Sequence, residues 1–269
     1  MTTHAQPPAM SMGRRMLNKV PEITLIFWAI KIMCTTVGET AADYLNDNLG
    51  LGLTKTTYVA GALLAGLLVV QFALRRYVPL VYWAVVVVIS VFGTLITDNM
   101  TDRYGVPLTT STIVFGVVLA AVFAVWYAME RTLSIHSIVT TRREAFYWLA
   151  ILFTFALGTA AGDLVAERFD VGYAVSIALF GGLILAVVVA HYAFRMNAVL
   201  SFWLAYILTR PLGASIGDEM SQNTHKYGGL GLGTTGTSYI FLACILGLVA
   251  YLTVTKRDQT PPEAVAAAQ

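Results

Sequence analysis

Four aspartates recur in this 269-residue chain, each at the same place in a repeated sequence pattern. Four positions after each aspartate stands a second acid, except in the last copy, where a glutamine takes its place. Carboxylate oxygens are the hard ligands that Mg²⁺, Ca²⁺ and Mn²⁺ prefer, so acids gathered in this number could bind a small cation. The aspartates are Asp43, Asp98, Asp163 and Asp218, and the residues that follow them are Asp47, Asp102, Glu167 and Gln222.

A structural interpretation of the same aspartates is open as well. Duplicated segments also keep turns and helix caps, so each aspartate could simply end a helix in water. Hydroxyl side chains stand where the following helices are expected to begin, at 54–57, 109–112 and 234–238. They could add neutral oxygen ligands or cap the starts of those helices.

The aspartates end four segments that align without a gap: FWAIKIMCTTVGETAAD, YWAVVVVISVFGTLITD, YWLAILFTFALGTAAGD and FWLAYILTRPLGASIGD. In each, an aromatic residue precedes a tryptophan, a glycine follows ten residues later, and the aspartate follows five residues after that. Such a fixed register indicates an array of similar units. The tryptophans are Trp28, Trp83, Trp148 and Trp203, and the glycines are Gly38, Gly93, Gly158 and Gly213.

Small residues also stand directly before each aspartate, four positions after the register glycine. Small residues at this spacing let helix backbones approach closely, as in the GxxxG motif. We therefore expect the glycines and tryptophans to pack the repeats together and the aspartates to approach a shared centre. The tryptophans are also expected to mark the cytoplasmic interface, where aromatic belts form.

Two basic residues, Lys31 and Arg210, fall inside apolar segments, where a charge is costly and needs a partner. We expect Arg210 to pair with Asp218, Glu219 or a neighbouring repeat's aspartate and so to tune the site, with a purely structural ion pair as the alternative. Lys31 is expected to extend its ammonium to the cytoplasmic interface. Glu39, one turn before the first aspartate, is a candidate carrier of a proton or cation.

Apolar residues make up 57% of the chain and the mean hydropathy is +0.71, well above a soluble domain's composition of about 45–50% apolar residues. Runs of about 20 apolar residues are long enough to cross a bilayer core of about 30 Å. The sequence predicts an all-α integral membrane protein in which eight transmembrane helices form four tandem parallel two-helix repeats. The helices are expected at 22–45, 55–74, 80–98, 109–129, 145–164, 172–194, 199–217 and 237–255.

Basic residues gather at the ends of the chain and at the even-to-odd connections, and acids gather at the opposite connections. The positive-inside rule therefore places both termini in the cytoplasm. We expect a multi-pass protein of the bacterial inner (plasma) membrane, with a disordered basic tail over 1–20, one membrane domain over 21–256 and a second disordered tail over 257–269. The repeats are expected near 21–76, 77–131, 144–195 and 197–255.

The four aligned segments resemble a family of uncharacterised bacterial membrane proteins, each built of four tandem repeats with two transmembrane segments and a recurring tryptophan. The resemblance runs from about Lys19 to Arg257 and implies the architecture, but it supplies no catalytic residue to transfer. The fourth copy departs from the pattern at Gln222 and in a glycine-rich connection, THKYGGLGLGTTGTS.

Enzymatic chemistry has little support in the sequence. The four histidines make no pair at metal or haem spacing, no histidine suits a Ser-His-Asp set, and no phosphate-binding glycine loop is present. The AAGD and SIGD segments differ from the GxGD motif of intramembrane aspartyl proteases at the first glycine. We expect no enzyme, no cofactor and no nucleic-acid partner, and the sequence leaves the oligomeric state open.

The residues predict a secondary transporter or channel-like carrier of a small cation, with a divalent metal ion and proton coupling among the options. The alternative is a non-transporting membrane scaffold or sensor, in which the repeat register only builds the bundle.

Overall fold

A computed structural model describes residues 18–45, 52–168, 172–223 and 229–259. Within these ranges the chain is helical, and eight of its helices are long and apolar enough to cross a membrane. Short π-helical turns continue α3 (η2, Asn99–Arg103) and α5 (η4, Leu164–Arg168), and a 3-10 turn (η3, Ile135–Ser137) precedes α5. The eight helices are α1 (Leu25–Asp43), α2 (Gly52–Ala73), α3 (Pro79–Asp98), α4 (Leu108–Glu130), α5 (Thr141–Asp163), α6 (Gly172–Phe194), α7 (Ala198–Ser221) and α9 (Gly233–Thr255).

The prediction of an all-helical chain with eight candidate membrane spans is confirmed, and the helix bounds differ from the expected ones by a few residues. The main differences lie at the connections that follow the aspartates: α7 continues to Ser221 and α9 begins at Gly233. Hydropathy detects where the apolar run stops, whereas backbone hydrogen bonds carry a helix on into polar surroundings.

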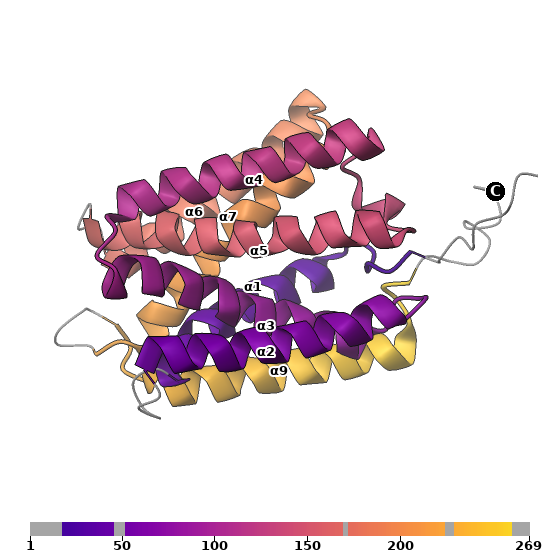
Figure 1. Cartoon of the computed structure of the whole chain (residues 1–269). Helices are drawn as coiled ribbons and strands as arrows, with labels where there is room; N and C mark the ends of the chain where they lie inside the picture. The colour runs from indigo at the N-terminus through magenta and orange to yellow at the C-terminus, as the bar shows by residue number, and fades with distance from the viewer. Residues whose placement is uncertain (1–17, 46–51, 169–171, 224–228, 260–269) are drawn as a thin grey trace, which may run out of the picture.

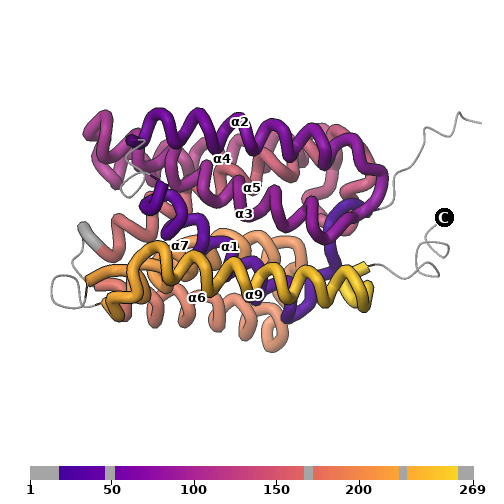
Figure 2. Tube along the Cα trace, turned by 90° about the horizontal axis from the view of Figure 1, so that it is seen from below, coloured from indigo at the N-terminus to yellow at the C-terminus, as the bar shows by residue number. Residues whose placement is uncertain are grey.

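The first helices of the four repeats form the inner ring of the bundle. Each packs against two others, α1 against α3 and α7, and α5 against the same pair. More than half of the apolar window of each of these helices is buried, whereas at most 28% of it is buried in the second helices. Figures 1 and 2 show α2, α4, α6 and α9 on the outside of the bundle.

Each second helix packs mainly on the first helix of the next repeat. Thus α2 lies on α3, α4 on α5, and α6 on α7, and the last helix, α9, returns to cover α1. Figure 2 shows α9 running beside α1 although the two helices stand at opposite ends of the chain. The repeats therefore form a closed cycle.

The two ends of the membrane domain meet beside the ring. The backbone N–H of Glu22 donates to the carbonyl of Asp258, and Tyr77 Oη donates to the Asp258 carboxylate at 2.5 Å. Burial raises the pKa of the Asp258 carboxyl above its usual range. The prediction that residue 258 lies in a disordered tail is therefore wrong, because a buried hydrogen bond holds it against the connection between α2 and α3.

The other predicted tail is wrong at its last residues in the same way. Lys19 is buried and its ammonium lies 2.6 Å from the carboxylate of Glu144, at the start of α5. The amide of Gln71 donates to the second oxygen of that carboxylate. A buried charge with these partners cannot belong to a solvated tail. Residues 1–17 and 260–269 lie outside the described residues.

Candidate functional site

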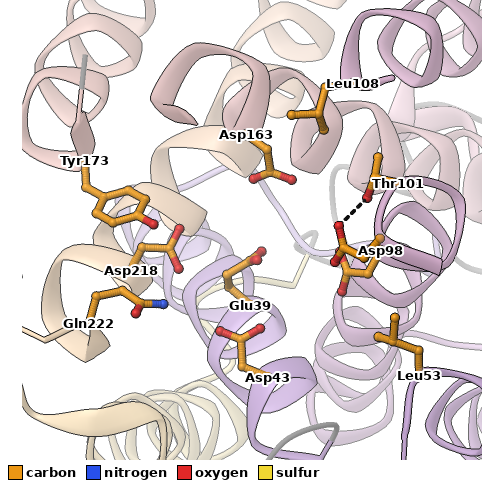
Figure 3. Close-up of a pocket in the computed structure, with 11 residues that line it drawn as sticks. Glu39, Asp43, Leu53, Asp98, Thr101, Leu108, Asp163, Tyr173, Asp218 and Gln222 are labelled. Atoms are coloured by element: carbon orange, nitrogen blue, oxygen red, sulfur yellow. Dashed lines mark hydrogen bonds between the residues drawn. The ribbon is translucent and has the colours of Figure 1, made fainter. Parts of the chain in front are cut away.

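The four aspartates of the repeat register line one cavity of about 340 Å³. Asp43, Asp98 and Asp163 are the last residues of α1, α3 and α5, and Asp218 lies in the last turn of α7. Glu39 lines the same cavity, and Figure 3 shows it near the middle of the four aspartates. The sequence-based expectation that close helix packing brings these acids to a shared centre agrees with this geometry.

The helical path of the backbone continues beyond the aspartates, although three of them are the last α-helical residues. The backbone continues into a π-helical turn after Asp98 and after Asp163, and Tyr44 stays helical after Asp43. Turns of this kind are frequent at functional sites. Each of these aspartates therefore stands inside a continuous helical segment, at the point where its winding changes.

The described acids of the cavity are not gathered closely around one point. Among the residues that the structure describes, no three histidine, cysteine, aspartate or glutamate side chains stand close enough together to hold one metal ion. Of the second acids, Asp102 lines the cavity together with Gln222, whereas Asp47 and the side chain of Glu167 lie outside the description. Binding of a cation by the aspartates along a pathway stays a prediction.

Residues four apart are neighbours on the surface of a helix, and at this spacing from the aspartates inward side chains of the inner helices contact one another across the ring. We name five layers along this axis. The aspartate layer is the set above. One turn deeper lies the oxygen layer, then the arginine layer, the lysine layer and the aromatic layer. The oxygen layer holds Glu39, Thr94, Thr159 and Ala214, and the arginine layer holds Thr35, Ser90, Phe155 and Arg210. The lysine layer holds Lys31, Val86, Ile151 and Tyr206, and the aromatic layer holds Phe27, Tyr82, Tyr147 and Phe202.

Burial changes along these layers. Every member of the arginine and lysine layers is 0% exposed, whereas the four aspartates are only half-buried. The cavity therefore opens at the aspartate end of the axis and is closed by side chains one to two turns below.

Arg210 closes the axis directly beneath the cavity. Its Nη2 donates to Glu39 Oε2 at 2.7 Å, to Thr159 Oγ1 at 2.7 Å and to Thr94 Oγ1. Its Nη1 donates to the Thr35 carbonyl at 3.4 Å. The ion pair with Glu39 is buried on both sides, since the two side chains are 0% and 10% exposed.

The expected partners of Arg210 are therefore wrong. Asp218 and Glu219 stand two turns further along the same helix as Arg210, but the arginine side chain points across the ring to α1. Gly158 on α5 makes room for this path, because a Cβ atom there would lie 2.5 Å from Arg210 Cβ.

Lys31 lies deeper on the axis and does not reach the cytoplasmic interface, so that expectation is wrong. Its Nζ lies 4.3 Å from the ring centroid of Phe155 and 4.2 Å from that of Tyr206. No hydrogen-bond partner for Nζ is found within the described part of the chain. Two aromatic faces attract the ammonium in place of a carboxylate.

The register tryptophans pack the repeats together, as expected, but they do not form an interface belt. Trp83, Trp148 and Trp203 are at most 4% exposed, because each packs on the aromatic-layer residue of the preceding repeat. Phe202 closes the cycle on Trp28, with ring centroids 5.7 Å apart. The belt interpretation is wrong for the three buried tryptophans.

The register glycines form the contact between neighbouring inner helices. A Cβ atom on any of the four would come closer than 3.0 Å to the arginine-layer residue of the next repeat. Close contact of this kind is what the sequence predicted for the four glycines. The contacts join Gly38 to Ser90, Gly93 to Phe155, Gly158 to Arg210, and Gly213 to Thr35.

Sequence reasoning missed Thr94 and Thr159, which hold Arg210 together with Glu39. The signal was present in the alignment, since both threonines occupy the position that Glu39 has in the first repeat. Their roles become visible only once the four segments are known to share one axis.

Fold and site together define a closed bundle of four two-helix repeats with an acidic cavity on its axis. The model of a family described as a repeat of unknown function (DUF347) matches residues 26–77, 81–132, 146–197 and 201–258. These matches cover most of the chain, so the chain belongs to this repeat family, and the resemblance seen in the sequence is confirmed. No curated protein and no solved structure matches the chain.

Proposed function

We propose that this protein is a secondary transporter or channel-like carrier of a small cation. The observation that carries the proposal is the convergence of four repeated aspartates and Glu39 on one cavity at one end of the bundle. A cavity lined by charges of one sign concentrates ions of the opposite sign. In the proposed arrangement, the eight helices cross a bacterial inner membrane, both termini are cytoplasmic, and the cavity faces outward.

The closed inner half of the axis supports a carrier rather than a permanently open pore. Arg210 and Lys31 stand on the axis below the cavity, and the aromatic layer lies below them. Passage of a cation therefore requires these layers to rearrange. Glu39 is the acid nearest to the arginine, and its protonation would weaken the ion pair, which makes proton coupling part of the proposal.

Ion flux in proteoliposomes tests the proposal. Purified protein is reconstituted, and uptake is measured for a panel of monovalent and divalent cations with and without a pH gradient. We expect flux of at least one cation, reduced at least about tenfold when the four aspartates are replaced by asparagine, which corresponds to about 1.4 kcal/mol. A control for the amide substitution itself is Asp258→Asn, which lies outside the cavity, and its folding is checked because Asp258 accepts a hydrogen bond from Tyr77.

Absence of flux for every ion in a folded preparation would overturn the carrier and favour the alternative, a non-transporting scaffold or sensor. Equal flux in the wild type and the four-asparagine variant would overturn the role of the aspartate layer. Both preparations are checked for folding by circular dichroism and a single size-exclusion peak.

A further inference from the structure

The oxygen layer directly beneath the acidic cavity surrounds a single nitrogen atom. Arg210 Nη2 has oxygen atoms from three inner helices within hydrogen-bond distance: Glu39 of α1, Thr94 of α3 and Thr159 of α5. A guanidinium Nη carries two hydrogens, so three acceptors exceed what it can satisfy with linear hydrogen bonds. Three oxygens arranged around one positive nitrogen resemble the ligand shell of a cation.

The threonine hydroxyls face the axis with their lone pairs. Thr94 Oγ1 lies 3.2 Å from the Ser90 carbonyl and Thr159 Oγ1 lies 3.1 Å from the Phe155 carbonyl, and each hydroxyl donates its one hydrogen there. Neither hydroxyl has a hydrogen left for the axis. The layer therefore offers only acceptor oxygens to whatever stands at its centre.

The repeats show that the arginine is a local addition to this layer. The positions equivalent to Arg210 hold Thr35, Ser90 and Phe155, all uncharged. The oxygen layer itself carries one formal charge, that of Glu39, and its fourth member, Ala214, contributes none. The guanidinium thus supplies the single positive charge that balances the layer.

We propose that the oxygen layer is a binding site for a small monovalent cation and that Arg210 occupies it as a tethered cation, which a substrate cation has to displace. The inference rests on the proposed function and narrows its substrate class. A buried site favours charge neutrality. In the structure one positive charge, that of Arg210, stands against Glu39 in this layer. A monovalent ion is the replacement that keeps this one-to-one balance.

Replacing the tether tests this site directly. Arg210→Ser installs the residue that the second repeat holds at Ser90 and vacates the layer. Binding is measured on purified protein by calorimetry and thermal unfolding with LiCl, NaCl, KCl, guanidinium chloride and MgCl₂, against choline chloride at matched ionic strength. The control is the double variant Arg210→Ser/Glu39→Gln, which keeps the shape of the layer and removes its charge.

We expect Arg210→Ser to bind one of the monovalent cations at least about tenfold more tightly than the double variant does, equal to about 1.4 kcal/mol. Wild type and Arg210→Lys, which keep a tethered cation, should show no such gain. Equal cation dependence in the single and double variants, or a response to Mg²⁺ alone, would overturn the inference.

If Arg210→Ser folds poorly, because Glu39 is left buried without its partner, its folded yield becomes the readout. The yield should then rise with a monovalent metal or guanidinium chloride and not with choline chloride, whereas an identical response to all of these salts would overturn the inference. Flux separates this outcome from the proposed function. If wild-type flux depends on the aspartate layer but Arg210→Ser binds no cation, the binding site is refuted and the carrier function is kept. If Arg210→Ser binds a cation but the wild type shows no flux, the binding site is kept and the carrier function is refuted.

Discussion

The two halves of the ring differ sharply although they belong to the same four helices. We call the half that holds the aspartate and oxygen layers the outer half, and the half that holds the aromatic layer the inner half. In the outer half, carboxylates and hydroxyls surround a cavity, whereas in the inner half aromatic side chains meet on the axis and exclude it. Tyr82 and Tyr147 share a hydrogen bond of 2.5 Å across that inner half. The first helix of each repeat thus carries packing residues at one end and polar residues that line the cavity at the other.

The halves also differ in symmetry. All four aspartates, all four glycines and all four register tryptophans are kept, so the repeat preserves both the cavity wall and the helix contacts. Glu39, Arg210 and Lys31 each occur in one repeat only, and the two basic residues lie between the two halves. The repeated residues are the same on all four inner helices. The single ion pair between Glu39 of α1 and Arg210 of α7 is therefore what makes the axis asymmetric.

The largest loss of stability is expected at the inner end, where Lys19 and Glu144 form a buried ion pair. Lys19→Met leaves the carboxylate buried with only the Gln71 amide, and breaking such a pair costs about 3–5 kcal/mol. Reversible unfolding in detergent measures the loss. The control, Lys55→Met at an exposed lysine of α2, should stay within about 0.5 kcal/mol, and equal losses in both variants would contradict the prediction.

A smaller loss of stability is expected from substitution of a register glycine at the contact between two inner helices. Gly158→Ala forces a methyl group against Arg210 and Pro211, and overpacking of this kind costs about 1–3 kcal/mol. Gly181→Ala on α6 is the matched control, since its Cβ would meet nothing within 4 Å. Removal of a helical glycine there should leave stability equal or raise it by up to about 1 kcal/mol. A control as unstable as Gly158→Ala would show that the contact is not tight.

Loss of one hydrogen bond in the aromatic layer should cost less again. Tyr82→Phe removes the hydroxyl that pairs with Tyr147, for an expected loss of about 0.5–1.5 kcal/mol. Tyr239→Phe, at a tyrosine that is 68% exposed, should be neutral in the same unfolding measurement. Cation flux should survive both changes, and a Tyr82→Phe variant that folds yet loses flux would assign the inner half a direct role in transport.

The smallest change in stability is expected in the outer half, together with the largest change in flux. Asp98→Asn alters a half-buried residue at the cavity wall, so the free energy of unfolding should move by no more than about 0.5 kcal/mol. Flux should nevertheless fall, because the cavity loses a quarter of its repeated carboxylates. A stability loss comparable to that of Lys19→Met, with unchanged flux, would make the aspartates structural and erase the contrast between the halves.

Much of this architecture could be predicted from the sequence. Apolar runs locate the eight helices, and the gapless alignment places the aspartates at one depth. The GxxxG spacing at Gly158 and Gly213 predicts close contacts, and the structure has them. These features are local or repeat with a fixed period, which is why a single chain reveals them.

The partner of Arg210 and the place of Lys31 could not be predicted in this way. Choosing Glu39 over Asp218 requires knowing that the chain closes α7 onto α1, which no spacing within one segment reveals. Lys31 stands one turn from Trp28, which suggests an interface, but the other three register tryptophans lie in the core and Lys31 is 0% exposed. Both errors arise because the contacts depend on how distant helices pack together, which the pattern within one helix does not reveal.

The offset packing of the second helices bears on how the chain is made and how it arose. Because α9 is the helix that covers α1, the first helix keeps an incomplete contact surface until the last one has been synthesised. One repeat alone has no partner for its second helix, so an ancestral single unit would have needed further copies of itself to close the cycle. The first and last described segments meet at Glu22 and Asp258, so a circular permutant joined there and opened before the second repeat is expected to keep these helix contacts.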